Sequence, residues 1–374
     1  MYCNKISLVI ILIILLSNIV YSQNKTTNLS STNYAHSNNS DKNNIEMFFT
    51  NKGTSQSGIS QGGGFWQIEN ELYSRGMIYD IGPWIIGKRN NEIVLSGAQW
   101  QGAYSQGPII SGQAAMLIHP EDSLRYRVFK VNKGDDNSNP DYAEWPVDFG
   151  APVNEQGKPL ILGDQTLWTC YNYLDSTLNY PFYPFPSIDP LEIEIHQTVF
   201  ARKGNHPDIK DIFSNIIFIE FEIIYKGSEP IDSTFFGFWT DIDFDPLLPN
   251  IPAVDTSLQL GYCWTSEDTT WEGEIPISVG FSSLYGPVIP QIGATAKFKG
   301  RDLLNYKNLD INAFRGIGEI TLPSNDSLYL PILSVLDGWN FARGLNRNGN
   351  KYYNPLTGSY TSFPFSGDPV TGNG

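Results

Sequence analysis

The feature that most constrains the fold of this chain is a period-two alternation of apolar and polar residues that recurs in short segments. In an extended segment 216–225, Ile217, Ile219 and Phe221 share one face, and 191–199 alternates in the same way. Further runs rich in β-branched and aromatic residues lie at 46–50, 92–96, 125–131 and 167–171. The 34 glycines and 24 prolines supply turns between them. The pattern predicts a mostly β fold of antiparallel sheets packed as a β-sandwich.

One stretch has helical spacing instead. Residues 329–345 place apolar side chains three or four positions apart, and Gly344 near the end is a plausible helix stop. We therefore expect one short helix near 329–345. The chain has no internal repeat of 20–50 residues, which disfavours propellers and solenoids.

The N-terminus has the three-part pattern of a cleavable signal peptide. Lys5 is the only charge in residues 1–22, an almost wholly apolar core runs from Ile6 to Ile19, and the segment ends Val20-Tyr21-Ser22. The apolar core is too short for a bilayer span, which needs about 20 apolar residues. We expect cleavage after Ser22, export from the cytoplasm, and no membrane span afterwards.

The next residues differ from the rest. Residues 23–42 are rich in Asn, Ser and Thr and carry few large apolar side chains, so they are expected to form a disordered leader. From residue 43 to 374 the composition supports a single large β-rich domain.

The net charge argues against one class of binding partner, and the cysteine content argues against a disulfide framework. The net charge is −15, and removal of Lys5 with the signal makes it −16, so binding to a phosphate backbone is not expected. Cys170 and Cys263 remain after processing, and two isolated thiols on strand-like runs are more typical of buried apolar residues than of a disulfide.

The motif search favours a protein without catalysis. The sequence contains no Gly-x-Ser-x-Gly, His-Glu-x-x-His or Cys-x-x-Cys motif, and Gly62-Gly63-Gly64 lacks the Lys and the strand-to-helix setting of a phosphate loop. His119 and His206 each precede a proline and are expected in loops. His36 falls in the expected disordered leader.

An acidic strand is the candidate metal site. Asp241, Asp243 and Asp245 fall on one face of an extended segment, with Ile242 and Phe244 on the other. Oxygen ligands of this kind suit Ca²⁺, and Asp255 could return on a neighbouring loop as a further ligand. Two alternatives stay open: a solvated acidic edge, and a carboxylate pair for glycoside hydrolysis.

A second polar cluster and three tryptophans have weaker patterns. Glu192, Glu194 and His196 share one face of a strand, which we expect to be the solvated face of a half-buried strand; a carboxylate–histidine metal site is the alternative. The tryptophans are expected in the core, although exposed indole rings could stack on sugars; they are Trp66, Trp84 and Trp100.

A series of short stretches, in order along 43–374, carries a resemblance to a known class. They include the runs from Tyr126 to Gly134, Asn139 to Pro146, Trp239 to Asp243, Asn354 to Gly358 and Gly367 to Gly372. In this order they resemble the secreted Bacteroidota-type proteins of the type IX secretion class, which carry a C-terminal sorting domain. The resemblance implies transfer by the outer-membrane secretion machinery, followed by surface attachment or release.

The sorting tail of that class is missing from this sequence, which stops at Gly374. The resemblance therefore implies a domain that is truncated at its C-terminus. We expect a secreted or cell-surface protein, or a periplasmic one if the sorting tail is truly absent. The overall expectation is an exported structural or adhesive protein of unknown activity, stabilised by calcium. The alternative is a protein that binds or hydrolyses surface glycans.

Overall fold

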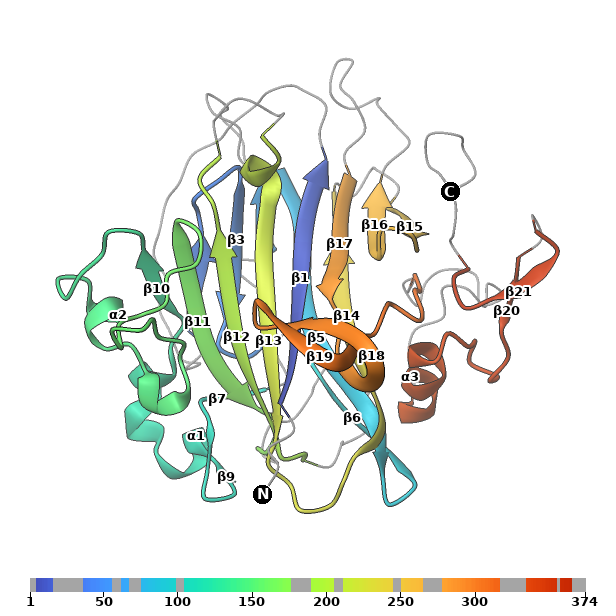
Figure 1. Cartoon of the computed structure of the whole chain (residues 1–374), viewed down its shortest axis with the longest axis horizontal. Helices are drawn as coiled ribbons and strands as arrows, with labels where there is room; N and C mark the ends of the chain where they lie inside the picture. Colours follow the sequence, from blue (N-terminus) through green and yellow to red (C-terminus); the bar gives the residue numbers. More distant parts are fainter. Residues whose placement is uncertain are drawn as a thin grey trace.

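Two antiparallel sheets pack face to face (Figure 1), which confirms the mostly β, sandwich-like fold. The computed structural model describes the backbone of residues 5–15 and 75 and all of 36–55, 62–66, 76–98, 104–175, 190–204, 211–244, 250–264, 278–316, 334–354 and 357–364. Trp100 and His206 lie outside these residues.

The larger sheet has nine strands, and its strand order is not the order of the chain. From one edge the strands are β10 (Phe129–Asn132), β11 (Gln165–Asn172), β12 (Ile193–Ala201), β13 (Ile216–Tyr225), β1 (Lys5–Leu15), β17 (Ser278–Tyr285), β16 (Leu260–Trp264) and β15 (Ile251–Asp255), and β7 (Ser105–Gln106) also pairs with β11. The strands β12 and β13 fall where the alternation predicts them.

The smaller sheet has six strands and supplies the second layer. Its order is β14 (Asp232–Ile242), β5 (Arg75–Arg89), β4 (Gly64–Trp66), β3 (Ile45–Thr50) and β2 (Ser37–Ser40), with β6 (Glu92–Gly97) also paired to β5. Three two-stranded ribbons complete the described strands: β8 (Ile109–Ile110) with β9 (Gln113–Ala114), β18 (Val288–Phe298) with β19 (Arg301–Asn308), and β20 (Tyr352–Asn354) with β21 (Ser359–Thr361).

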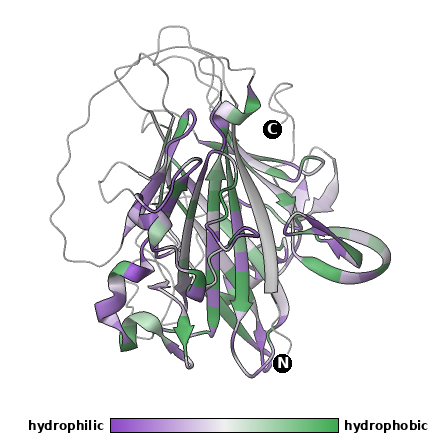
Figure 2. Cartoon of the chain, turned by 60° about the vertical axis from the view of Figure 1, so that its left-hand side comes forward, coloured by the Kyte–Doolittle hydropathy of each residue, from purple (hydrophilic) through white to green (hydrophobic). Residues whose placement is uncertain are grey.

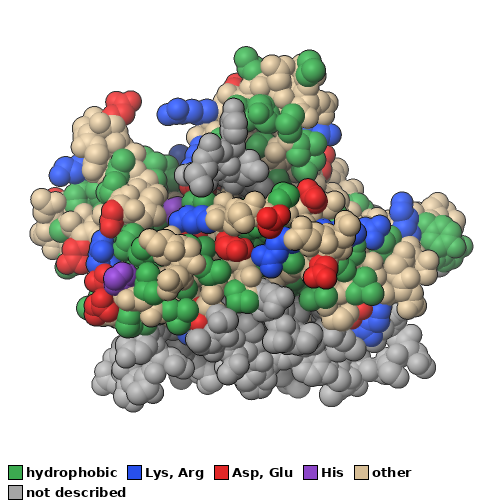
Figure 3. Space-filling model, turned by 90° about the horizontal axis from the view of Figure 1, so that it is seen from below, with side chains coloured by type: hydrophobic (Ala, Val, Ile, Leu, Met, Phe, Trp, Pro, Cys, Tyr) green, Lys and Arg blue, Asp and Glu red, His purple; other side chains and the backbone are tan. Residues whose placement is uncertain are grey.

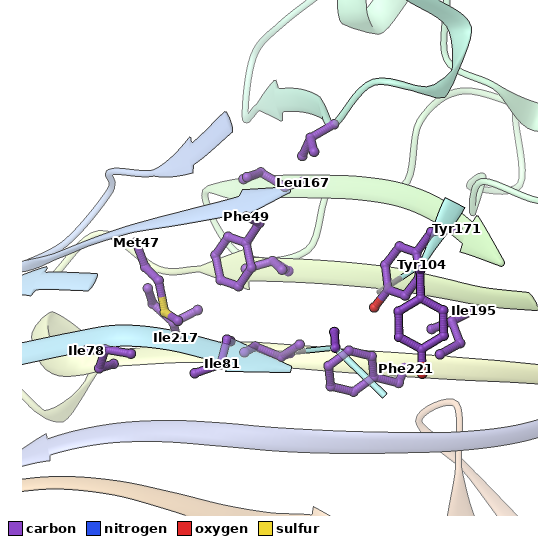
Figure 4. Close-up of a cluster of buried hydrophobic side chains, with 14 of the residues drawn as sticks. Met47, Phe49, Ile78, Ile81, Tyr104, Leu167, Tyr171, Ile195, Ile217 and Phe221 are labelled. Atoms are coloured by element: carbon purple, nitrogen blue, oxygen red, sulfur yellow. The ribbon is translucent and has the colours of Figure 1, made fainter. Parts of the chain in front are cut away.

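The main core lies between the two sheets. Met47, Phe49 and Ile81 from the smaller sheet meet Ile217 and Phe221 from the larger one (Figure 4). These positions alternate along their strands, so the period-two pattern of the sequence becomes the inner face of each layer. The prediction that Trp66 and Trp84 are core residues is confirmed, since both are buried.

Two smaller clusters cover the outer faces of the sheets. The helix α3 (Val335–Ala342) places Trp339 and Phe341 against Trp84 and Leu95 of the smaller sheet. On the larger sheet, residues 107–163, here named the covering segment, pack onto β11 and β12. That segment contains the short helices α1 (Ala115–Ile118), η1 (Pro120–Tyr126), α2 (Pro140–Ala143) and η2 (Val147–Phe149), and η3 (Ile212–Asn215) lies before β13.

The predicted helix is present but shorter than 329–345. It begins after Ser334, whose side chain accepts a hydrogen bond from the Asp337 backbone N–H (3.1 Å), as an N-cap does. It ends before Gly344, whose φ of +69° suits a glycine, so the predicted stop is confirmed. Among the described helices, none has the length and apolar character that crossing a bilayer requires.

The predicted strand 125–131 is wrong over its first half. Pro120 starts the 3-10 helix η1, which continues through Tyr126, and the strand β10 begins only at Phe129. Proline fits the first turn of a helix because its missing N–H is not needed there. The alternation at Tyr126 and Val128 reflects burial of an irregular segment instead of a strand.

The expected disordered leader does not extend to residue 42. The strand β2 pairs with β3, and the His36 ring accepts a hydrogen bond from the Val128 backbone N–H (3.2 Å). Residues 23–35 lie outside the described residues. Further upstream, β1 from the predicted signal peptide pairs with β13 and with β17, antiparallel to both. Signal cleavage stays a prediction.

Candidate functional site

The three described aspartates of the predicted calcium site belong to two different sheets of the sandwich. Asp241 is on β14 of the smaller sheet, and Asp243 is exposed just beyond the end of that strand. Asp255 ends β15 of the larger sheet. Asp245 lies outside the described residues, so the calcium site as a whole stays a prediction.

Asp255 already serves a local turn. Its Oδ1 accepts hydrogen bonds from the Ser257 backbone N–H (2.8 Å), the Ser257 hydroxyl (2.6 Å) and the Leu258 N–H (3.2 Å). These bonds, led by that of the Ser257 hydroxyl, hold the pKa of Asp255 below its ordinary value. One carboxylate oxygen therefore closes a turn, and Oδ2 is the atom that a cation would use.

Asp80 is the acidic residue that sequence reasoning missed. It lies on β5, directly opposite Asp241 on β14, and is fully buried. Its Oδ1 accepts the backbone N–H of Ser55 (2.7 Å) and of Ile81 (2.8 Å). Burial, with a smaller contribution from the Asp241 charge, raises the pKa of Asp80 to about 7. A single acid inside the apolar run 77–86 was the available signal.

The most densely connected polar cluster is centred on Glu194 of β12. One carboxylate oxygen, Oε1, lies 2.9 Å from Nε2 of His196. The other, Oε2, accepts hydrogen bonds from the Lys226 ammonium (2.6 Å) and from the Ile109 backbone N–H (2.5 Å). Burial alone would raise the pKa of Glu194, but the hydrogen bonds from His196 and Lys226 outweigh burial and hold the pKa below its ordinary value.

The expectation that Glu194 and His196 lie on a solvated face is wrong. Both side chains are buried, because the covering segment lies over this face of the larger sheet. The His196 ring packs edge-on against Trp168 (5.4 Å between centroids), and Gly150 of the covering segment lies over its Cε1 atom. Glu192 is at the partly exposed start of this row and pairs with Arg89 at 3.2 Å.

Cys170 completes this cluster. It lies on β11 opposite His196, and its sulfur lies within 4.8 Å of the nearest ligand atoms of Glu194 and His196. Among the described residues, this is the one group of three or more Cys, His, Asp or Glu side chains brought so close together. Cys170 and Cys263 are free and buried, which confirms the interpretation of both as core thiols.

A hollow of about 410 Å³ lies on the covering segment. Arg125 bonds Asp148 (2.7 Å) at its rim, and Arg127 bonds both Asp141 (2.8 Å) and Glu144 (2.9 Å). Its lining is Arg125, Arg127, Phe129, Ala143, Glu144, Trp145, Pro146 and Asp148. Charges of both signs are interspersed on the face of the molecule seen from below (Figure 3), so the net charge forms no single acidic field there.

In comparisons with known proteins, no protein-family model, no curated protein and no solved structure matches the chain.

Proposed function

We propose that this protein works outside the cytoplasm as a structural or adhesive β-sandwich that binds a partner macromolecule through the ribbon of β18 and β19. The proposal of export is based on the signal-peptide pattern of residues 1–22 and on the resemblance to the type IX secretion class. The outer-membrane secretion machinery would be the partner that transports the protein. The cell surface is the expected destination.

The ribbon is the observation that supports a binding role. Among the described strands, β18 and β19 pair with each other and with no third strand, and a bulge separates Pro290 from Thr295. Figure 2 shows the ribbon standing out from the body of the sandwich. A two-stranded ribbon is marginally stable by itself in water, because it has few neighbours to pack against.

The ribbon exposes large apolar side chains. Ile292 is 95 % exposed and Leu304 is 70 % exposed. Exposed apolar side chains concentrated on a protruding element are typical of a binding surface. The turn of the ribbon is held to the body by the Lys299 ammonium, which donates to the Glu222 carboxylate on β13 (2.8 Å). This tether fixes the direction in which the ribbon presents those side chains.

A cell-binding assay tests the proposal. Fluorescently labelled protein is titrated onto intact cells of the producing strain, and the double variant Ile292→Lys with Leu304→Lys is compared with wild type. We expect the variant to lose at least about tenfold in affinity, which corresponds to about 1.4 kcal/mol. Leu124→Lys is the matched control, since Leu124 is 74 % exposed on η1 of the covering segment. Equal loss in the control, or none in the double variant, would refute the ribbon as the contact surface.

A glycan ligand is the second candidate, and the hollow on the covering segment favours it. Its volume of about 410 Å³ falls within the range of about 300–1,000 Å³ typical of small-molecule sites. Arg125, Arg127 and Glu144 offer donors and acceptors for sugar hydroxyl groups. Titration with soluble surface glycans should then give binding that Arg127→Met abolishes and Lys299→Met leaves unchanged. No heat of binding with wild type would dismiss this candidate.

A further inference from the structure

Three side chains of different chemistry meet on the outer face of the larger sheet. Cys170 comes from β11, and Glu194 and His196 come from β12, where the alternation places both on the same face. One ligand atom of each lies within 4.8 Å of the other two, and all three residues are buried. A thiol, an imidazole and a carboxylate are the ligand types that Zn²⁺ takes in proteins.

The spacing is near that of a tetrahedral site. With Zn–S of about 2.3 Å and Zn–N or Zn–O of about 2.0–2.2 Å, neighbouring ligand atoms lie about 3.3–3.6 Å apart. Glu194 Oε1 and His196 Nε2 are already 2.9 Å apart. The Cys170 sulfur lies within 4.8 Å of a ligand atom of each partner, so a shift of about 1 Å would bring it to tetrahedral spacing. Three protein ligands leave one tetrahedral position for a solvent molecule.

The other nitrogen of His196 supplies an independent indication. His196 Nδ1 is buried and has no hydrogen-bond partner, although the nearest oxygen of Glu222 is 4.0 Å away. In zinc sites the ligating histidine commonly donates its second N–H to a carboxylate, which orients the ring. If Nε2 binds the metal, the ring proton moves to Nδ1, and this N–H then points to a carboxylate that Lys299 already holds.

We propose that Cys170, Glu194 and His196 form a Zn²⁺ site on the outer face of the larger sheet. The Cys170 thiol releases its proton to solvent as the sulfur binds, and the histidine proton shifts from Nε2 to Nδ1. Oε1 of Glu194 binds the ion, while Lys226 and the Ile109 N–H keep Oε2. The sulfur and nitrogen ligands favour zinc over calcium, which takes oxygen ligands. The three ligands lie on the larger sheet and not on the ribbon, whose Lys299 contacts the neighbouring Glu222 carboxylate.

The thiol makes the affinity depend on pH. Burial raises the pKa of Cys170 well above its ordinary value, so the metal must displace a tightly held proton. Zinc affinity should therefore rise by about tenfold for each pH unit in the neutral range, since one proton leaves for each ion bound.

Cobalt, which reports its ligands in its absorption spectrum, tests the site. Metal-free protein is titrated with Co²⁺ in the folded state and also during refolding from urea, because the three side chains are buried. We expect a sulfur-to-cobalt charge-transfer band in the near ultraviolet, visible bands of a tetrahedral ion, and loss of both on addition of Zn²⁺. Wild-type protein without the charge-transfer band under either condition overturns the proposal, whatever the variants do.

Two substitutions and one control assign the ligands. Cys170→Ser should abolish the charge-transfer band, and His196→Gln should weaken Co²⁺ binding by at least about tenfold. Cys263→Ser removes the other buried thiol, on β16, and should keep the full spectrum. Circular dichroism in EDTA checks that each variant folds without metal. A band that persists in folded Cys170→Ser also overturns the proposal.

Discussion

Asp80 offers the sharpest test of the electrostatics inside the sandwich, through the substitution Asp80→Asn. Oδ1 accepts two backbone N–H groups, whereas the buried Oδ2 has no hydrogen-bond partner. Asparagine keeps the carbonyl acceptor and places an amide where Oδ2 lies, and Asp241 is the residue opposite on the neighbouring strand. The substitution therefore removes a titrating group without removing its acceptor.

The magnitude follows from the pKa of Asp80. Burial raises the pKa from its ordinary value of 3.8 to about 7, so the folded chain binds this proton more tightly than the unfolded chain. The stabilisation from the proton is complete below pH 3.8 and is lost as pH rises to about 7. At about 1.36 kcal/mol per pH unit, the total loss is about 4 kcal/mol. Because the amide introduced by Asp80→Asn does not titrate, the variant should be more stable than wild type by about 2–4 kcal/mol at pH 8 and no more stable at pH 4.

Urea denaturation followed by tryptophan fluorescence, at intervals from about pH 3 to pH 8, measures this difference. Asp255→Asn is the control of opposite sign: hydrogen bonds lower the pKa of Asp255, so its stabilisation is present above pH 3.8 and is lost as the medium becomes acid. That variant should be slightly less stable than wild type at pH 7, and the difference should shrink as the pH falls below 3.8. An Asp80→Asn variant that is less stable at every pH, or a difference that does not change with pH, would refute a protonated Asp80.

Three further predictions address the buried cluster and the acidic strand. Lys226→Met leaves the Glu194 carboxylate without its cation and should lower the free energy of unfolding by about 2–4 kcal/mol at pH 7. The loss is smaller than the full cost of breaking a buried pair because Lys226 is one-third exposed. In urea denaturation the loss should shrink in acid, where a protonated Glu194 carries no charge, and a loss independent of pH would contradict this. Gly150→Ala should cost at least about 1–3 kcal/mol, because φ is +97° and a Cβ would lie 2.5 Å from Cε1 of His196; the imidazole NMR signals should shift, and unchanged signals would argue against the contact. Calcium at about 100 times its Kd should add about 2.7 kcal/mol to wild-type stability measured against EDTA; a gain that survives in Asp243→Asn would place the ion elsewhere.

Local patterns were sufficient where one strand face is apolar along its whole length. The strand β13 begins and ends where Ile216–Tyr225 predicts, because alternate residues pack into the core between the sheets. The stop of α3 at Gly344 was equally local. In contrast, the segment before Phe129 alternates for only a few residues, and the proline at 120 sets a different backbone.

The buried cluster could not be predicted because its environment comes from distant parts of the chain. Glu194 and His196 have the alternation of a half-buried strand, and the covering segment, which comes earlier in the chain than β11, lies over them and removes them from solvent. The cation that neutralises Glu194 arrives on Lys226 after β13, in register with the start of β12. A polar row covered by a separate segment has the same sequence pattern as a solvated one.

The position of β1 makes the apolar N-terminal segment a strand of the larger sheet, in addition to its predicted role in export. While it is attached, the segment Lys5–Leu15 joins β13 to β17 through backbone pairs on both sides. If a peptidase removes it, two rows of N–H and C=O groups on β13 and β17 would face each other at about twice the strand spacing of about 4.8 Å. The chain with the segment and the chain without it then cannot have the same hydrogen-bonded sheet. After removal, β13 and β17 must pair directly with each other, or another strand must take the place of β1. The segment Lys5–Leu15 would thus be a strand of the sheet in a folding intermediate. Which of the two sheets forms would depend on whether cleavage comes before or after folding.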